Sequence, residues 1–279
     1  MTYHSPTDLS SALALAANGK GKIIAGGTDV YPTQGQGEAP ETYLDLTKVI
    51  RLSGITHESD GSFRIGATTT WSGINDTHLP PAFDALKQAA KEVGSIQIQN
   101  AGTIAGNICN ASPAADRVPP LLALDARIEM MSAQRGVRML PLSEFIQGVR
   151  KTALAKDELV SAILIPPLPD GAKAAFEKLG SRRFLVISIS MVAAVISCDQ
   201  NGLICDARVS VGSCSPVAVR LTQLEQDILG KRPREIVVTD KHLTALTPIS
   251  DVRGRKNYRM DVVGTQCERA IRRACDDAQ

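Results

Sequence analysis

Residues 22–29 of this chain read KIIAGGTD, and residues 101–116 read AGTIAGNICNASPAAD. The first stretch is a short apolar strand that runs directly into two glycines. Because glycine has no Cβ, main-chain N–H groups in such a turn can approach an anion closely, and successive amides form a concave anion site. From the residues alone, Gly26 and Gly27 form either such a site or an ordinary tight turn.

The second stretch carries no charged residue before Asp116, yet it is rich in Thr, Asn and Ser. Polar, uncharged residues spaced by glycines suit a polar ligand that is bound by backbone groups and hydroxyls. Asp116 either accepts hydrogen bonds from sugar hydroxyls or, together with Ser112, caps a short helix. We expect a long loop over residues 95–116, with a short helix that begins near Asp116.

Helix and strand patterns surround both stretches. The apolar spacing from Leu9 to Ala17 predicts a helix, which begins at Ser5-Pro6-Thr7-Asp8 with Ser5 as its cap. A second helix is predicted over residues 81–93. The same patterns predict strands over five segments: 43–46, 54–58, 63–67, 127–132 and 159–165.

Residues 165–171, IPPLPDG, are the strongest linker signal in the sequence. We therefore expect two domains, residues 1–168 and residues 171–279. Beyond the linker, three strands precede three helices, near 175–179, 186–198 and 204–213, and near 216–229, 233–246 and 258–277. This order predicts a small α+β layer, and we assign the chain to the α+β class.

Composition excludes several classes of protein. The 31 basic and 29 acidic residues leave a formal net charge of +2, and there are only 5 Phe, 4 Tyr and 1 Trp. The chain therefore lacks the basic, aromatic-rich groove of a nucleic-acid binder. No apolar run reaches about 18 residues, and the opening MTYHSPTD is no secretory signal. We expect no membrane span and a cytoplasmic location.

The cysteines and histidines form no metal-binding pattern. The six cysteines never occur as C-x-x-C, and the four histidines are scattered, whereas zinc and iron–sulfur sites normally show paired ligands. We expect no metal site and reduced thiols. Neither glycine stretch has the Rossmann or P-loop pattern, and no catalytic Ser-His-Asp order stands out, so no catalytic residue is assigned.

Together, residues 25–29 (AGGTD) and 103–116 (TIAGNICNASPAAD) resemble the FAD-binding subunit of the molybdenum hydroxylases, the family of xanthine dehydrogenase and carbon monoxide dehydrogenase. The resemblance continues in residues 176–183 (FEKLGSRR), 211–216 (VGSCSP) and 251–259 (DVRGRKNYR). It implies an FAD-binding domain of the vanillyl-alcohol-oxidase (PCMH) type with two subdomains, about 1–55 and 56–168, followed by a small α+β domain.

The resemblance also implies the FAD-binding residues. The cofactor's diphosphate would be wrapped by the amides of Ile23, Ile24, Ala25, Gly26, Gly27, Thr28, Asp29 and Val30. Its other side would be lined by Thr103, Gly106, Asn107, Asn110 and Ser112. Asp116 would hold ribose or ribityl hydroxyls, Leu159 would pack on the isoalloxazine, and Lys178 would approach the flavin. Many relatives have glycine where this chain has Ala105, so binding requires that position 105 needs no positive φ.

The implied function is electron transfer within a larger enzyme. FAD on this chain would receive electrons from [2Fe–2S] clusters of a small partner subunit and pass them to NAD⁺ or another acceptor. A large partner subunit would hold molybdopterin and the substrate, in a heterotrimer or a dimer of heterotrimers. The alternatives are a self-sufficient FAD-dependent oxidoreductase and a non-enzymatic nucleotide-binding redox module.

Overall fold

The computed structural model describes residues 1–19, 21–32, 40–182 and 185–276, so Arg183 of the family-like segment lies outside the described residues. The chain divides into two compact units. Unit 1 comprises Met1–Thr77, Ser95–Ala111 and Ala126–Pro166, and unit 2 comprises His78–Gly94, Ser112–Asp125 and Pro167–Gln279. The last crossing lies inside the linker predicted at residues 165–171, but two segments before the linker also belong to unit 2.

Unit 1 begins with a small parallel sheet in the order β1-β3-β2. Its strands are β1 Thr2–His4, β2 Lys22–Ile24 and β3 Thr42–Asp45. Helix α1 (Leu9–Ala16) connects β1 to β2 and packs Leu9 and Ala12 into the same apolar cluster as Leu44 of β3. Since the strands are parallel, their carboxyl ends meet at one edge, where the Gly26-Gly27 turn follows β2.

The rest of unit 1 is built on an antiparallel sheet in the order β4-β5-β10-β6-β7. Its strands are β4 Ile55–His57, β5 Phe63–Gly66, β6 Arg127–Ser132, β7 Gly136–Pro141 and β10 Leu159–Ile165. The remaining elements of unit 1 are α2 Trp71–Asp76, α4 Ile96–Ala101, α5 Ile104–Asn110, α7 Leu142–Phe145 and the hairpin of β8 Ile146–Gly148 and β9 Lys151–Thr152. Leu159 of β10 joins the α1 cluster, so α1 shares one core with both sheets.

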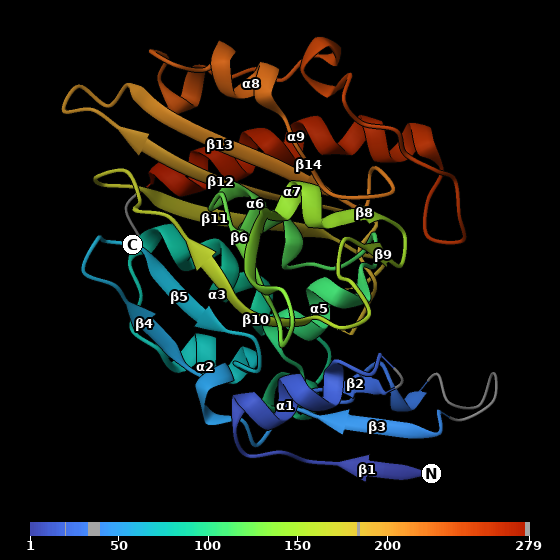
Figure 1. Cartoon of the computed structure of the whole chain (residues 1–279). Helices are drawn as coiled ribbons and strands as arrows, with labels where there is room; N and C mark the ends of the chain where they lie inside the picture. The colour runs from blue at the N-terminus through green and yellow to red at the C-terminus, as the bar shows by residue number, and fades with distance from the viewer. Residues whose placement is uncertain (20, 33–39, 183–184, 277–279) are drawn as a thin grey trace. The chain divides into compact units, whose positions relative to one another are not determined.

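Unit 2 is an antiparallel sheet with helices on both faces (Figure 1). Its elements are β11 Lys173–Leu179, β12 Ser190–Cys198, β13 Ile204–Gly212, β14 Val219–Arg220, α3 Asp84–Lys91, α6 Val118–Ala123, α8 Thr222–Asp227 and α9 Lys256–Cys275. Val192 and Ala194 of β12 share a core cluster with Cys267 of α9. On the opposite face, Ser210 of β13 donates to the carbonyl of Pro119 in α6, at 2.5 Å.

The cap predicted for the first helix is wrong. Strand β1 pairs with β3, so the chain is still extended where Ser5 was expected to cap. Asp8 is the cap instead, and its carboxylate accepts a hydrogen bond from the N–H of Ser11 at 2.8 Å. The predicted helix therefore exists, one turn later than the sequence signal places its cap.

Three other expectations need correction. The predicted loop over 95–116 contains the helices α4 and α5, and the next helix, α6, begins only at Val118. The helix predicted over 233–246 is two short 3₁₀ helices, Pro233–Glu235 and Asp240–Leu243, separated by residues 236–239, a β-branched run that disfavours helix. The helix predicted over 216–229 is shortened to α8, because β14 first pairs with β13.

The α+β class is confirmed: antiparallel sheets dominate, and helices cover them. None of the helices in the described part of the chain combines the length and apolar character needed to cross a membrane.

Candidate functional site

The Gly26-Gly27 turn is a close main-chain approach that only glycine permits. A Cβ at Gly26 would overlap the carbonyl oxygen of Ala101. Gly27 has a φ of +69°, and a Cβ there would overlap the ring of Tyr31. The two glycine stretches therefore meet within unit 1, with the first packed against the start of the second.

The amides of this turn are available for a ligand. Within the described residues, the N–H groups of Gly26, Gly27 and Thr28 donate no hydrogen bond to the chain. The turn is closed by the N–H of Tyr31, which donates to the carbonyl of Gly27 at 3.1 Å. Three consecutive amides without a partner, next to a positive φ, have the character of an anion-binding concavity. Their contact with a diphosphate stays a prediction.

At the start of α5, the main-chain amides are already used. Thr103 caps α5. The N–H of Ile104 donates to the carbonyl of Thr69 at 3.0 Å, and the N–H of Ala105 donates to the carbonyl of Ala67 at 3.2 Å. The next two N–H groups donate to Thr103: that of Gly106 to its hydroxyl at 3.2 Å, and that of Asn107 to its carbonyl at 3.1 Å. Ala105 lies inside α5 and has no positive φ, so the main chain at this position accepts alanine in place of the glycine that many relatives have. Any contribution of residues 104–107 to a ligand must therefore come from their side chains or carbonyl groups.

Two asparagines of α5 provide such side chains. The Oδ1 atom of Asn107 is buried and has no hydrogen-bond partner among the residues that the structure describes, which is costly unless a ligand supplies a donor. Asn110 accepts hydrogen bonds from Arg150, whose Nη1 atom lies 3.2 Å from the Asn110 carbonyl oxygen. Arg150 stands between β8 and β9 with a φ of +58°, and its own N–H donates to Ala111 at 2.9 Å. No motif in the sequence marks Arg150.

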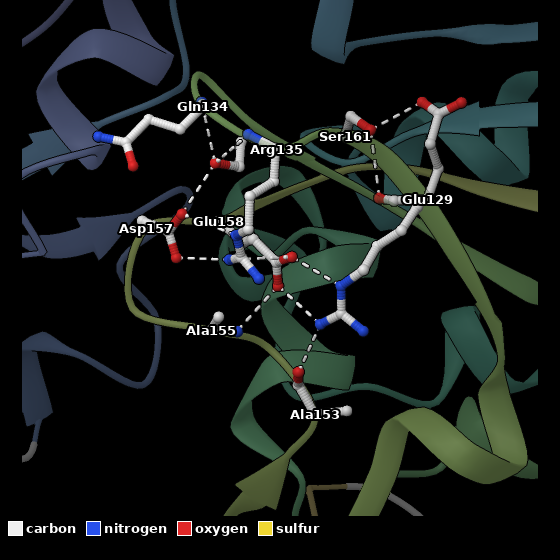
Figure 2. Close-up of polar contacts among 10 residues, drawn as sticks. Glu129, Gln134, Arg135, Ala153, Ala155, Asp157, Glu158 and Ser161 are labelled. Atoms are coloured by element: carbon white, nitrogen blue, oxygen red, sulfur yellow. Dashed lines mark hydrogen bonds and ion pairs between the residues drawn. The ribbon is translucent and has the colours of Figure 1, made fainter.

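Leu159 is held firmly at the start of β10. The carboxylate of the preceding Glu158 accepts from Arg138 at 2.6 and 2.7 Å and from the N–H of Ala155 at 2.9 Å; Figure 2 shows this carboxylate beside Arg135 and Ala155. The hydrogen bonds from Arg138 hold the pKa of Glu158 below its ordinary value, although burial opposes this. The Leu159 side chain is only 1% exposed because the α1 cluster covers it. Its contact with a flavin stays a prediction.

Two of the predicted residues of unit 2, Asp116 and Lys178, form an ion pair. Asp116 is 8% exposed and accepts hydrogen bonds from the Lys178 Nζ, at 2.7 Å, and from the Ser188 hydroxyl. Ser112 accepts from the N–H of Ala114 at 3.3 Å. Asp116 does not cap α6, whose N-cap position is occupied by Arg117 without a side-chain bond. The ion pair joins two residues that the resemblance singled out separately.

A buried arginine that sequence reasoning did not place in the site fixes the segment beside Ser188. Arg259 of α9 donates to the carbonyls of Ile189 and of Ser213, the latter at 2.7 Å, and pairs with Asp251 at 2.8 Å. Its only sequence signal is the family-like segment 251–259. Among the described residues, no group of three or more His, Cys, Asp or Glu could hold a metal ion.

Comparison with known proteins decides the family. Residues 1–168 match the family described as the FAD binding domain in molybdopterin dehydrogenase, and residues 174–274 match the CO dehydrogenase flavoprotein C-terminal domain. The chain belongs to the FAD-binding subunits of the molybdenum hydroxylases. The family predicted from the two glycine stretches is confirmed, and with it an oxidoreductase component that contains an FAD-binding domain.

Individual relatives match this FAD-binding subunit over nearly its whole length. It is 32% identical to the xanthine dehydrogenase FAD-binding subunit of Escherichia coli O157:H7, over 98% of this chain and 95% of the relative. It is 27% identical to the carbon monoxide dehydrogenase medium chain of Hydrogenophaga pseudoflava, over 98% and 96%. The solved structure of reconstituted CO dehydrogenase from Oligotropha carboxidovorans superposes with a TM-score of 0.90 at 26% identity, over 100% and 98%.

Proposed function

We propose that the Gly26–Thr28 turn binds the diphosphate of FAD, and that this subunit is the electron outlet of a multi-subunit hydroxylase. The observation that carries the proposal is the turn itself. Throughout the described residues, its three consecutive amides find no acceptor in the chain, at a place where the main chain tolerates no Cβ. Such amides bind an anion with little rearrangement, because the backbone is already folded around the ligand position.

The side chains of α5 fit the less charged parts of the cofactor. The buried Asn107 Oδ1 needs a donor, and the sugar and ribityl hydroxyls of FAD are donors. Arg150 holds Asn110 and brings a positive charge to the same helix. In unit 2, the contact with Lys178 orients the Asp116 carboxyl group, whose oxygens can accept a hydrogen bond from a hydroxyl. Roles for Asp116 and Lys178 in binding FAD stay predictions.

The chemistry that FAD supplies when bound is electron transfer, in this proposal between [2Fe–2S] clusters of a small partner subunit and NAD⁺ or another acceptor. A large partner subunit would hold molybdopterin and the substrate, in a heterotrimer or a dimer of heterotrimers. The relatives support this division of work, since their names call them an FAD-binding subunit and a medium chain. All six cysteines are free thiols, which supports a cytoplasmic location.

Titration of the purified chain with FAD, followed by flavin fluorescence, tests the binding site. We expect saturable binding of one FAD per chain, and its loss in Gly27→Val, which would force a side chain into the turn. Gly136→Val is the matched control, because Gly136 has a similar φ of +73° but open space around its Cβ position. Equal FAD affinity in the wild type and Gly27→Val would contradict the proposed site.

Co-purification from native extract tests the assembly. We expect a larger and a smaller chain to accompany the FAD-binding subunit, and substrate to reduce the bound flavin only when all three are present. Reduction of an acceptor by the isolated chain with a substrate would contradict the proposal and favour a self-sufficient oxidoreductase.

A further inference from the structure

We propose that Tyr31 recognises the adenine ring of the cofactor by stacking. The inference rests on the proposed diphosphate site at Gly26–Thr28 and adds to it the residue that distinguishes a nucleotide from a bare diphosphate.

Tyr31 belongs to the same turn as the unpartnered amides. Its N–H closes the turn on the Gly27 carbonyl at 3.1 Å, and its ring occupies the space that a Cβ on Gly27 would need. The aromatic ring and the amides are therefore fixed relative to each other by a few bonds of main chain. Even so, Tyr31 is 53% exposed, so a large part of its ring surface is open to a ligand.

Tyr3 of β1 lies close enough to Tyr31 for the two side chains to interact. The Tyr3 hydroxyl donates to Asp45 Oδ2 at 2.8 Å, and Asp45 is itself fixed by the N–H and hydroxyl of Thr47, at 2.9 and 2.7 Å. The hydrogen bond to Asp45, followed by burial and the negative charge of Asp45, raises the pKa of Tyr3 to about 12. Because the N–H of Tyr31 fixes its main chain in the turn, the ring loses less entropy on stacking than a ring on an unattached segment would.

The chemistry of FAD points to adenine as the group that stacks. One ribose separates the adenine from the diphosphate, whereas the five-carbon ribityl chain separates the isoalloxazine from it. An aromatic ring beside the diphosphate amides is therefore closer to the adenine. Stacking of a base on a tyrosine requires no hydrogen-bond pattern and contributes substantially to affinity.

The test measures binding of FAD, ADP and inorganic pyrophosphate to the full chain, with the last two as competitors of FAD. ADP and pyrophosphate share the diphosphate, but only ADP carries adenine. We expect Tyr31→Leu to lower the affinity for FAD and for ADP about tenfold, the order of one base–aromatic stack, and to leave pyrophosphate within about twofold. Tyr31→Phe keeps the ring and should retain most of the affinity for FAD and ADP.

Each outcome separates this inference from the proposal beneath it. An equal loss of pyrophosphate and ADP affinity in Tyr31→Leu would mean that Tyr31 only shapes the turn, and unchanged ADP affinity would mean that it does not touch the base; both overturn the inference and leave the FAD site standing. A wild-type chain that binds neither FAD nor ADP would overturn both. Thermal unfolding of each variant checks that the fold is intact.

Discussion

The two glycine stretches touch in unit 1 at Gly26 and Ala101, yet they use their main chain in opposite ways. After β2, the amides of Gly26, Gly27 and Thr28 are without acceptors among the described residues. The turn leaves no space for a Cβ atom at Gly26 or Gly27. At the start of α5, the four amides from Ile104 to Asn107 all donate within the chain. The first stretch is therefore prepared for an anion, and the second is a rigid frame that presents side chains.

This difference predicts that substitutions in the two stretches have separable effects. Changes in the first should act on affinity for FAD by altering the anion site. Changes in the second should act on stability when they touch the frame, and on affinity only when they touch a side chain that faces the ligand.

The largest effect is expected for Gly26→Ala. Its Cβ would overlap the carbonyl of Ala101, which is main chain and cannot rotate away, so the two stretches must separate. We expect FAD affinity to fall by about a hundredfold or more and unit 1 to lose about 3 kcal/mol. Fluorescence titration and denaturant unfolding measure both quantities.

Gly21→Ala is the matched control for this variant. Gly21 stands before β2, and a Cβ there would lie at an ordinary 3.7 Å from the Thr42 side chain. We expect little change in affinity or stability. If Gly26→Ala behaved like this control, the close approach of the two stretches would be wrong.

Asn107→Ala should separate affinity from stability within the second stretch. Because Asn107 Oδ1 is buried and finds no partner in the described part of the chain, removing this oxygen costs the cofactor-free chain no hydrogen bond and relieves an unsatisfied group. We expect FAD affinity to fall about tenfold, while the melting temperature without FAD stays equal or rises. A lower melting temperature of Asn107→Ala without FAD would show that Asn107 stabilises the fold itself.

Thr103→Val should show the opposite behaviour. Thr103 was predicted to line the cofactor, but its hydroxyl accepts from the N–H of Gly106 as the cap of α5. Loss of such a cap costs about 1 kcal/mol of stability, and we expect FAD affinity to stay within about twofold. Thr103→Ser, which keeps the hydroxyl, should restore stability. A large loss of FAD affinity in Thr103→Val but not in Thr103→Ser would show that the Thr103 hydroxyl contacts the cofactor.

The smallest effect concerns alkaline pH. The pKa of Tyr3 is raised from its ordinary value of 10 to about 12, chiefly by the hydrogen bond to Asp45. A raised pKa in the folded state gives stability that is complete below pH 10 and is lost as the pH rises through 12. Tyr3 is half exposed, so the effect is small. Unfolding followed between pH 9 and 12 should show this loss in the wild type and not in Tyr3→Phe.

The sequence predicted the first stretch better than the second for a physical reason. A strand that ends in two glycines is a local signal, and β2 and its turn are where that signal places them. Helix α5 contains Gly106, Asn107 and Asn110, all poor helix formers, so its helical state was not visible. Long-range bonds such as Thr69 to Ile104 hold it together, and no short window of sequence contains them.

Pairings across long sequence distances were equally invisible. Asp116 and Lys178 are 62 positions apart, and the resemblance marked each of them without indicating that they form an ion pair. Arg150 reaches Asn110 across 40 positions from a hairpin in which its φ is positive. Such contacts depend on which strands become neighbours, and that is decided by the packing of the whole unit.

Unit 2 is built from three separate segments of the chain, so no single cut in the sequence separates it from unit 1. The helices α3 and α6, which cover one face of its sheet, are encoded before the linker, within the region that matches the FAD-binding family. A gene fragment cut at the linker would yield a sheet with one side bare, and Ala193 and Val195 would meet water. The parts of the chain before and after the linker therefore cannot be exchanged separately between relatives. A chimera would keep the sheet of unit 2 covered only if both parts came from the same protein.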